Sequence, residues 1–322
     1  MPATVSRLVL AVLIGVGLPP ALTYADQPST IPKIGLLTFP PLQELLRDGL
    51  RERGYVEGKN IVIDWRPGST NDEEMQAQAT ALIRSKVDVI VTFGTPATRA
   101  ALAATKAIPI VFSAGDPVAT GFAVSLAKPG GNATGLSALT TELISKRLEL
   151  LHQVAPRARH VAYLMNSSNP AGPLQLKEVQ KAVRALGVQL ITLEARNAAE
   201  LDTALQSLSR SGADSLLVTA DVMLQANKSK IARAVRQARL PTMVPYRNYL
   251  DAGILMSYGP NLKDLTLRVA GYVDKILKGA KPADLPIEQV SNYELIIDQR
   301  VARELGIKVP QELLYRADEV IR

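Results

Sequence analysis

Val87-Asp88-Val89-Ile90-Val91-Thr92 is an apolar run of strand length with little of the polar alternation that marks a sheet with one solvent-exposed face. Such a composition is typical of a parallel strand that helices cover on both sides. Ala213-Asp214-Ser215-Leu216-Leu217-Val218-Thr219 repeats this run in the second half of the chain. Each run is followed by a helical segment and then by a short strand, Ile108-Pro109-Ile110-Val111 or Leu240-Pro241-Thr242-Met243. The repeat predicts two domains of the same βαβ type, each with its own sheet.

Strand-length apolar runs alternate with longer amphipathic segments along the rest of the chain. The expected strands are Ile34–Thr38, Ile61–Trp65, Val87–Phe93, Ile108–Ser113, His160–Met165, Val188–Leu193, Ser215–Thr219, Pro241–Pro245 and Ile254–Tyr258. The expected helices include Leu42–Arg53, Asp72–Lys86, Pro173–Leu186, Ala198–Arg210 and Lys228–Arg239. This alternation predicts an α/β protein with two Rossmann-like, doubly wound domains built on parallel sheets.

Length and composition are those of a globular protein with room for two hydrophobic cores: 322 residues, 47% of them hydrophobic and 21% charged. The formal net charge is +7, from 37 Lys and Arg against 30 Asp and Glu. These basic residues are spread over helices, and one Trp and four Phe provide no stacking surface for bases. We therefore expect no nucleic-acid partner.

The N-terminal 25 residues have the pattern of a secretory signal peptide. Arg7 is followed by an apolar stretch from Leu8 to Val16, and Thr23-Tyr24-Ala25 places small residues at the positions that a signal peptidase reads. Cleavage is expected after Ala25, which would deliver the protein to the periplasm. The alternative is an uncleaved membrane anchor, although the apolar stretch is short for a span of about 30 Å. The chain has no cysteine, so it is not expected to be a lipoprotein or to contain disulfides.

Motifs for catalysis are missing from the sequence. It has no phosphate-binding loop, no Gly-x-Gly-x-x-Gly fingerprint and no Gly-x-Ser-x-Gly elbow. His152 and His160, its two histidines, show no metal-ligand spacing, so we expect no metal and no cofactor. A carboxylate pair made of Asp116 and Asp221 would suit a glycosidase, and this alternative stays open. The motifs favour a binding protein over an enzyme.

Small and polar residues follow six of the expected strands. In an open parallel sheet, ligands bind beyond the carboxyl ends of the strands. Several of these segments also begin a helix, where free backbone N–H groups and the positive end of the helix dipole lie. Each polar residue could equally be an ordinary N-cap, but three such ends in each half favour one shared cleft. The segments are Thr38-Phe39-Pro40, Gly94-Thr95-Pro96, Ser113-Ala114-Gly115-Asp116-Pro117, Asn166-Ser167-Ser168-Asn169-Pro170, Ala220-Asp221 and Tyr246-Arg247.

A set of motifs resembles one bacterial family. They are Gly54-Tyr55-Val56-Glu57-Gly58-Lys59-Asn60-Ile61, Gly115-Asp116-Pro117-Val118, Lys128-Pro129-Gly130-Gly131-Asn132-Ala133-Thr134-Gly135, Lys146-Arg147-Leu148-Glu149-Leu150-Leu151 and Leu255-Met256-Ser257-Tyr258-Gly259. The chain resembles, from about Ile31 to Arg322, the ABC-transporter substrate-binding proteins related to the tryptophan- and tyrosine-binding periplasmic proteins.

The resemblance implies a type I periplasmic-binding fold, with two lobes joined by three hinge crossings. The first lobe would hold residues 31–138 and 252–287, and the second would hold residues 139–251 and 288–322. The crossings are expected near Leu136–Leu139, Asp251–Gly253 and Ile287–Ser291. Gly135 and Gly253 would suit hinge segments, because the backbone there must absorb the closing movement.

The resemblance also implies a set of pocket residues. Family members that bind aromatic amino acids hold the ligand carboxylate with hydroxyls and backbone N–H groups, and the ammonium with an acidic side chain. Asp221 is the expected acid in this chain. The expected ligand-binding residues are Thr38, Phe39, Thr95, Ser113 and Asp116 in the first lobe, and Asn166, Ser167, Asn169, Asp221 and Tyr246 in the second.

The function that these observations favour is delivery of a small organic solute, such as an amino acid or aromatic compound, to an ABC importer. The protein is expected to be a monomer whose partners are its ligand and the importer's membrane subunits. A periplasmic sensor that presents the solute to a membrane receptor is an alternative. A transcriptional repressor with the same core would need a DNA-binding domain ahead of it, and residues 1–30 show the signal-peptide pattern instead.

Overall fold

The computed structural model describes residues 31–39, 42–69 and 71–322. The predicted signal peptide and its cleavage site lie outside these ranges. Residues Pro32–Arg322 form one compact unit. Of the helices described, none is long and apolar enough to cross a bilayer.

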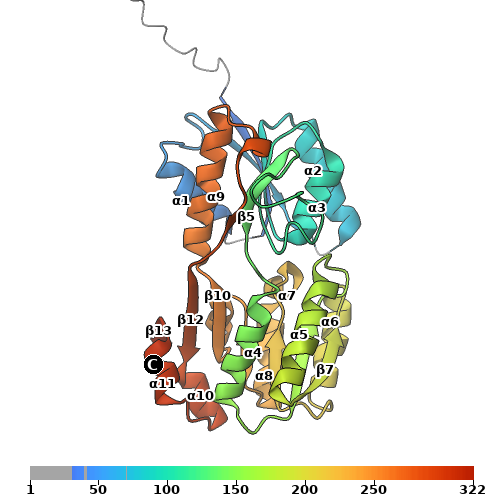
Figure 1. The fold of residues 1–322 in the computed structure, drawn as a ribbon, viewed down its shortest axis with the longest axis vertical. Coiled ribbons are helices and arrows are strands. Elements are labelled where there is room, and N and C mark those ends of the chain that lie inside the picture. Colours follow the sequence, from blue (N-terminus) through green and yellow to red (C-terminus); the bar gives the residue numbers. More distant parts are fainter. Residues whose placement is uncertain (1–30, 40–41, 70) are drawn as a thin grey trace, which may run out of the picture. The chain divides into compact units, whose positions relative to one another are not determined.

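The first sheet has six strands in the order β11-β5-β4-β3-β1-β2, and all of its neighbouring strands pair in parallel. Its strands are β1 (Lys33–Thr38), β2 (Val62–Pro67), β3 (Val89–Phe93), β4 (Ile110–Ala114), β5 (Ala133–Ser137) and β11 (Glu288–Gln289). The helices beside it are α1 (Leu42–Arg51), α2 (Asp72–Arg84), α3 (Thr95–Ala104) and α9 (Leu262–Leu277), with the short 3₁₀ helix η2 (Pro282–Asp284) (Figure 1). α1 and α9 contribute to one apolar cluster, and α2 and α3 contribute to another. The sheet is therefore covered on both faces.

The second sheet has seven strands in the order β13-β12-β10-β9-β8-β6-β7. Its strands are β6 (His160–Met165), β7 (Gln189–Glu194), β8 (Ser215–Val218), β9 (Thr242–Val244), β10 (Met256–Pro260), β12 (Tyr293–Asp298) and β13 (Glu319–Ile321). Its helices are α4 (Leu143–Val154), α5 (Gly172–Leu186), α6 (Ala198–Leu208), α7 (Val222–Ala226), α8 (Lys228–Ala238), η1 (Arg247–Ala252), α10 (Gln299–Leu305) and α11 (Gln311–Arg316). β10 and β12 pair antiparallel, so this sheet is mixed rather than wholly parallel as expected.

Burial explains why the central strands could be read from sequence. Every residue of β3 and of β4 is buried, whereas the edge strands β2 and β7 are largely exposed or half-buried. Each large apolar side chain removed from water contributes about 1.5–3 kcal/mol, so a strand covered on both faces is selected for an unbroken apolar run. The two sheets, with their own cores, confirm the predicted α/β fold with two lobes.

The chain passes between the sheets three times. It leaves β5 for α4, it leaves β10 for α9, which packs against α1, and it leaves β11 for β12 (Figure 1). The second passage therefore lies at residues 260–262 and not at the expected 251–253, because β10 still pairs with β9 of the second sheet. Gly253 ends η1 inside the second lobe. Gly135 lies in β5, where a β-carbon would come within 2.0 Å of the Phe112 carbonyl oxygen, so no other residue fits there.

Candidate functional site

A cavity of about 60 Å³ lies where the carboxyl ends of strands from both sheets meet. Six strands end at or just before residues of its wall: β3, β4 and β5 of the first sheet, and β8, β9 and β10 of the second. The residues that line it are Leu42, Phe93, Gly94, Thr95, Pro96, Ser113, Ala114, Gly115, Ala138, Thr140, Asn169, Ala220, Asp221, Val222, Gln225, Tyr246, Pro260, Leu262 and Leu265.

The polar wall of the first lobe is the start of α3. Gly94 is the N-cap and provides no side-chain cap, so the first-turn N–H groups have no acceptor from the capping residue. Thr95 and Ser113 line the cavity beside this helix start and are only 5% and 6% exposed. Within the described part of the chain, neither hydroxyl makes a hydrogen bond to protein. Pro96 has no N–H, so the first-turn donors are the N–H groups of Thr95 and Ala97; with the positive helix end and the two hydroxyls they could hold an anionic oxygen.

The acidic wall of the second lobe is Asp221, the N-cap of α7. Its Oδ1 accepts hydrogen bonds from the backbone N–H groups of Met223 and Leu224, at 2.8 and 3.1 Å. Its Oδ2 accepts from the side-chain amides of Asn166 and Asn169, at 3.2 and 2.7 Å. Burial raises the pKa of the carboxyl, and these hydrogen bonds oppose that rise. Asp221 thus caps a helix, and it also lines the cavity.

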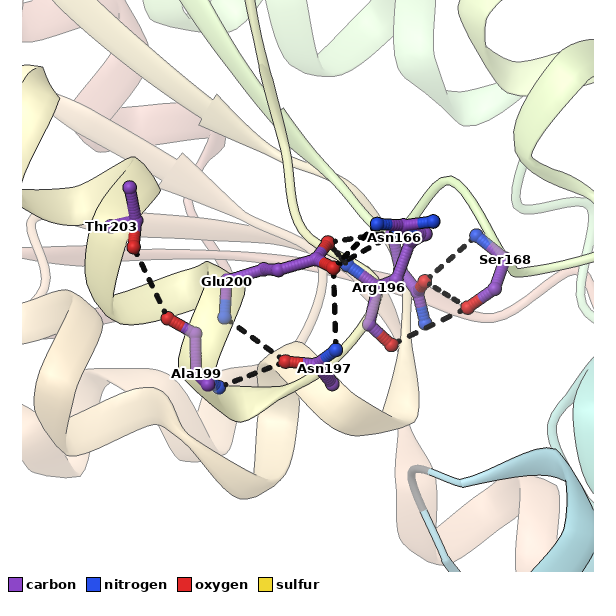
Figure 2. A network of polar contacts seen from close by, with 7 residues as sticks. All are labelled: Asn166, Ser168, Arg196, Asn197, Ala199, Glu200 and Thr203. Atoms are coloured by element: carbon purple, nitrogen blue, oxygen red, sulfur yellow. Dashed lines mark hydrogen bonds and ion pairs between the residues drawn. The ribbon is translucent and has the colours of Figure 1, made fainter.

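The two asparagines that hold Asp221 are themselves fixed by their own loop. Asn169 Oδ1 accepts from the Ala171 N–H at 3.0 Å. Asn166 Oδ1 accepts from the N–H and the hydroxyl of Ser168, at 3.0 and 2.7 Å, as Figure 2 shows. The Ser168 hydroxyl also lies 3.4 Å from the Arg196 carbonyl oxygen, next to the start of α6.

Figure 2 also shows why that start of α6 is well defined. Asn197 accepts from the N–H groups of Ala199 and Glu200, both at 3.0 Å, and the Glu200 carboxylate pairs with Arg196. The Glu200 carboxylate also accepts from the backbone N–H of Arg196 at 2.9 Å, so it fixes the residue before the N-cap. The network links the surface of the second lobe to Asn166, and through Asn166 to the cavity.

The remaining walls are mostly apolar. They come from Leu42, Phe93, Val222, Leu262 and Leu265. Asp221 and Tyr246 are the only ionisable side chains among the lining residues of the described chain. The described residues also include no group of three His, Cys, Asp or Glu side chains that could hold a metal ion. The cavity therefore suits a small molecule with one anionic group, one cationic or donor group and an apolar body.

Residues 42–321 match the sequence model of a protein family, the ABC transporter substrate binding proteins. The match covers most of the chain. The chain belongs to this family. Periplasmic solute-binding proteins of lower sequence identity share its two-lobed arrangement, which is the type I periplasmic-binding fold.

Two relatives of this substrate-binding protein are named for an aromatic amino acid or were solved with one. It is 26% identical over 260 residues to a "Tyrosine-binding protein" of Clostridioides difficile, covering 80% of this chain and 74% of the relative. An ABC domain from Streptococcus pneumonia, solved in complex with L-Trp, is 26% identical with a TM-score of 0.84, covering 91% of this chain and 100% of that one. A ligand-free, open substrate-binding protein with adhesive properties from Clostridium difficile is 25% identical with a TM-score of 0.63, covering 90% and 99%.

Half of the ten predicted site residues of this substrate-binding protein line the cavity. They are Thr95, Ser113, Asn169, Asp221 and Tyr246.

The other five lie beside the cavity or away from it. Thr38 is buried at the end of β1, and Phe39 packs against Gly68. Asp116 accepts a hydrogen bond from the Thr141 hydroxyl, and Asn166 acts through Asp221. Ser167 is half-buried and is not part of the cavity wall.

Sequence reasoning missed the wall that the hinge segments provide. Thr140 and Ala138 follow the first passage, whereas Pro260 and Leu262 belong to the second. Only the second passage carries a local signal, Pro260-Asn261, where Asn261 is the N-cap of α9. The first passage has no motif that marks it as part of a substrate-binding wall.

Proposed function

We propose that the chain is an extracytoplasmic solute-binding protein that closes on a small zwitterion, such as an amino acid with an uncharged side group, and delivers it to an ABC importer. Binding would be the whole of its biochemical activity. The observation that carries the proposal is that the hydroxyls of Thr95 and Ser113, which make no hydrogen bond to another described residue, line the same cavity as the buried Asp221 carboxylate.

The carboxylate of the ligand fits the first-lobe wall. Thr95 and Ser113 provide two hydroxyl donors, and the first turn of α3 provides backbone donors and its positive dipole end. A hydrogen bond to a charged group contributes about 1.5–3 kcal/mol, more than a bond between neutral groups. A neutral amide in place of the carboxylate would lose most of that contribution.

The ammonium of the ligand fits Asp221. Burial raises the pKa of this carboxyl, so the charged form lacks stabilisation in the ligand-free protein. Asp221 takes part in no ion pair between described residues; its four hydrogen bonds come from neutral donors. A cation in the cavity would supply the missing charge.

Closure of the lobes follows from contacts across the cavity. A β-carbon on Gly94 of the first lobe would lie 2.9 Å from Val222 Cγ1 of the second, so the lobes touch there. At about 60 Å³ the cavity is smaller than most ligand pockets, which begin near about 300 Å³, so a ligand must enter while the lobes are apart. The higher TM-score with the L-Trp complex than with the ligand-free open relative supports a closed arrangement in this structure.

A titration of the mature protein with the proteinogenic amino acids tests the proposal. We expect at least one amino acid with an uncharged side group to bind with a dissociation constant near 1 μM, about −8 kcal/mol. Its amide should bind at least about ten-fold more weakly, because the α3 start favours an anion. Thr95→Val should weaken the acid by about ten-fold or more and the amide much less. Isothermal titration calorimetry gives these values.

Thr80→Val is the matched control, because its hydroxyl bonds the Gln76 carbonyl in α2, away from the cavity. It should leave affinity unchanged. Equal affinity for acid and amide would contradict the placing of the carboxylate, and no binding by any amino acid would contradict the proposed ligand class.

Export is a separate expectation. With Arg7, the apolar stretch and the small residues at Thr23 and Ala25, the precursor should be cleaved so that the mature chain begins at Asp26. N-terminal sequencing of the periplasmic fraction checks this. Full-length protein found only in the cytoplasm would contradict it.

A further inference from the structure

Arg147 is a buried arginine in α4 with 1% of its surface exposed. Burying a guanidinium is costly unless an acid or a full set of acceptors compensates for the lost water. Arg147 takes part in no ion pair between the residues that the structure describes, and its Nη2 has no hydrogen-bond partner. Burial lowers its pKa to about 10, so the side chain is still a cation at neutral pH. A group kept at such a cost calls for an explanation.

The acceptors of Arg147 lie in the first passage and in the strand that leads into the second passage. Its Nε donates to the Tyr258 carbonyl oxygen at 2.7 Å, and Tyr258 lies in β10, just before the second passage. Its Nη1 donates to the Thr140 carbonyl oxygen at 3.5 Å, and Thr140 lies in the first passage, between β5 and α4. One planar guanidinium thus bridges the first passage and the strand from which the second passage starts.

The third passage joins the same cluster through an aromatic contact. The rings of Tyr258 and Tyr293 lie 6.1 Å apart, centre to centre, and Tyr293 is the first residue of β12 after that passage. Tyr293 also donates a hydrogen bond to the Val290 carbonyl within the passage. The second-lobe ends of all three passages therefore lie around the Arg147–Tyr258 contact.

The free Nη2 lies directly behind the cavity wall. A β-carbon on Gly259 would be 3.4 Å from Nη2 and 1.8 Å from the Pro245 carbonyl oxygen, so Gly259 and Pro245 approach closely beside the guanidinium. The next residues along the chain, Pro260 and Tyr246, both line the cavity. A movement of Arg147 would therefore displace residues adjacent in sequence to the cavity-lining Pro260 and Tyr246.

We propose that Arg147 is a positioning residue of the hinge: through the carbonyl oxygens of Thr140 and Tyr258 it ties the first passage to the strand end that leads into the second, and so fixes the lobe arrangement in which the cavity closes. The proposal deepens the proposed function, since it concerns closure of the same site. Without the tie, the two passages bend independently, the lobes sample a wider range of separations, and a bound ligand escapes sooner.

The test measures the lobe separation in the ligand-free protein. The chain has no cysteine, so Lys106→Cys in the first lobe and Lys181→Cys in the second give two exposed sites for spin labels. Arg147→Met, Arg147→Lys and the control Lys146→Met are each made in this labelled protein and compared with it. Lys146 is the neighbouring residue on the same helix, and its exposed side chain pairs with Glu149. Pulsed electron paramagnetic resonance then gives the distance distribution for each.

We expect the distribution to become about two-fold broader in Arg147→Met and in Arg147→Lys, and to be unchanged in Lys146→Met. Arg147→Lys keeps the charge but loses the planar guanidinium that reaches both carbonyl oxygens, so its distance distribution should stay broad. With L-tryptophan or L-tyrosine, whichever the labelled protein binds, dissociation should be about five-fold faster in both Arg147 variants, with little change in association.

An unchanged width in Arg147→Met, or a normal width in Arg147→Lys, would overturn the proposal. Arg147→Lys is the more conservative change and decides the matter if Arg147→Met does not fold. The ligand-free width is independent of the ligand. If no amino acid binds the unmodified protein, the proposed function fails, while the widths still report on Arg147.

Discussion

Asp221→Asn is expected to lower both the stability and the ligand affinity of the protein. The Asn oxygen can keep the two backbone hydrogen bonds at the start of α7. Its amide nitrogen would then face the amides of Asn166 and Asn169, which donate to the carboxylate in the native protein. Each buried donor left without an acceptor costs about 1–3 kcal/mol, so with two such donors the free energy of unfolding should fall by about 2–6 kcal/mol. Urea unfolding measures this loss.

The same variant removes the negative charge that we assign to the ligand's ammonium. Affinity for the amino-acid ligand should fall by about ten-fold or more, from the loss of a charge-assisted hydrogen bond. Asn71→Asp is the control, because Asn71 is an exposed N-cap whose oxygen accepts from Glu73 and Glu74 in the same way. It should change neither quantity appreciably. If Asp221→Asn unfolds at the native urea concentration, the hydrogen bonds from Asn166 and Asn169 to Asp221 do not contribute to stability as described. If it binds the ligand with native affinity, Asp221 acts only as the N-cap of α7.

Gly94→Ala is expected to hinder closure. Gly94 has φ +91°, which a residue with a side chain rarely adopts, and a β-carbon there would lie 2.9 Å from Val222 Cγ1 across the cavity. The backbone strain costs about 1–3 kcal/mol in either state of the lobes, whereas the contact with Val222 penalises only the closed state. Ligand affinity should therefore fall by about ten-fold or more. Calorimetry measures it, and small-angle scattering should show less compaction on ligand addition.

A double-mutant cycle separates the contact from the strain. Val222→Ala removes the side chain that the new β-carbon would meet, so the double variant Gly94→Ala/Val222→Ala should recover part of the lost affinity. The coupling between the two substitutions, measured on the binding free energy, should be about 0.5–3 kcal/mol, as for residues in direct contact. Val222→Ala alone measures the effect on affinity of removing this cavity-lining side chain. Additive effects would mean that the two lobes do not touch at Gly94 when the ligand is bound.

The central strands buried on both faces were predicted from their apolar runs, and the more exposed edge strands β2 and β7 were also predicted, with their ends shifted by one or two residues. β6 spans His160–Met165 as expected, because its apolar run is unbroken. β5 was not predicted, since Ala133-Thr134-Gly135-Leu136-Ser137 is small and polar and becomes a strand only by pairing with β4 and β11. β12 was missed for a related reason, because it joins its sheet antiparallel after the third passage. In both cases tertiary pairing overrides a weak local preference.

The site was predictable where a polar residue directly follows a buried strand. Asp221 after β8 and Ser113 near the end of β4 were found in this way, and both line the cavity. Asp116 follows the same rule but adopts φ +45° and bonds Thr141, so it is not part of the wall. Arg147 lies in an ordinary helical segment, and its burial depends on passages more than 100 residues away in sequence, such as Tyr258 at a separation of 111. No local pattern could have found it.

Native mass spectrometry of the mature protein, purified without added ligand, tests the central claim most directly. The account predicts a fraction of the protein carrying one adduct with the mass of an amino acid, because tightly bound solutes remain through purification. That adduct should be lost in Asp221→Asn and in Thr95→Val and retained in Thr80→Val. If only the mass of the empty chain is seen, and adding amino acids produces no complex, the protein does not close on the kind of ligand proposed.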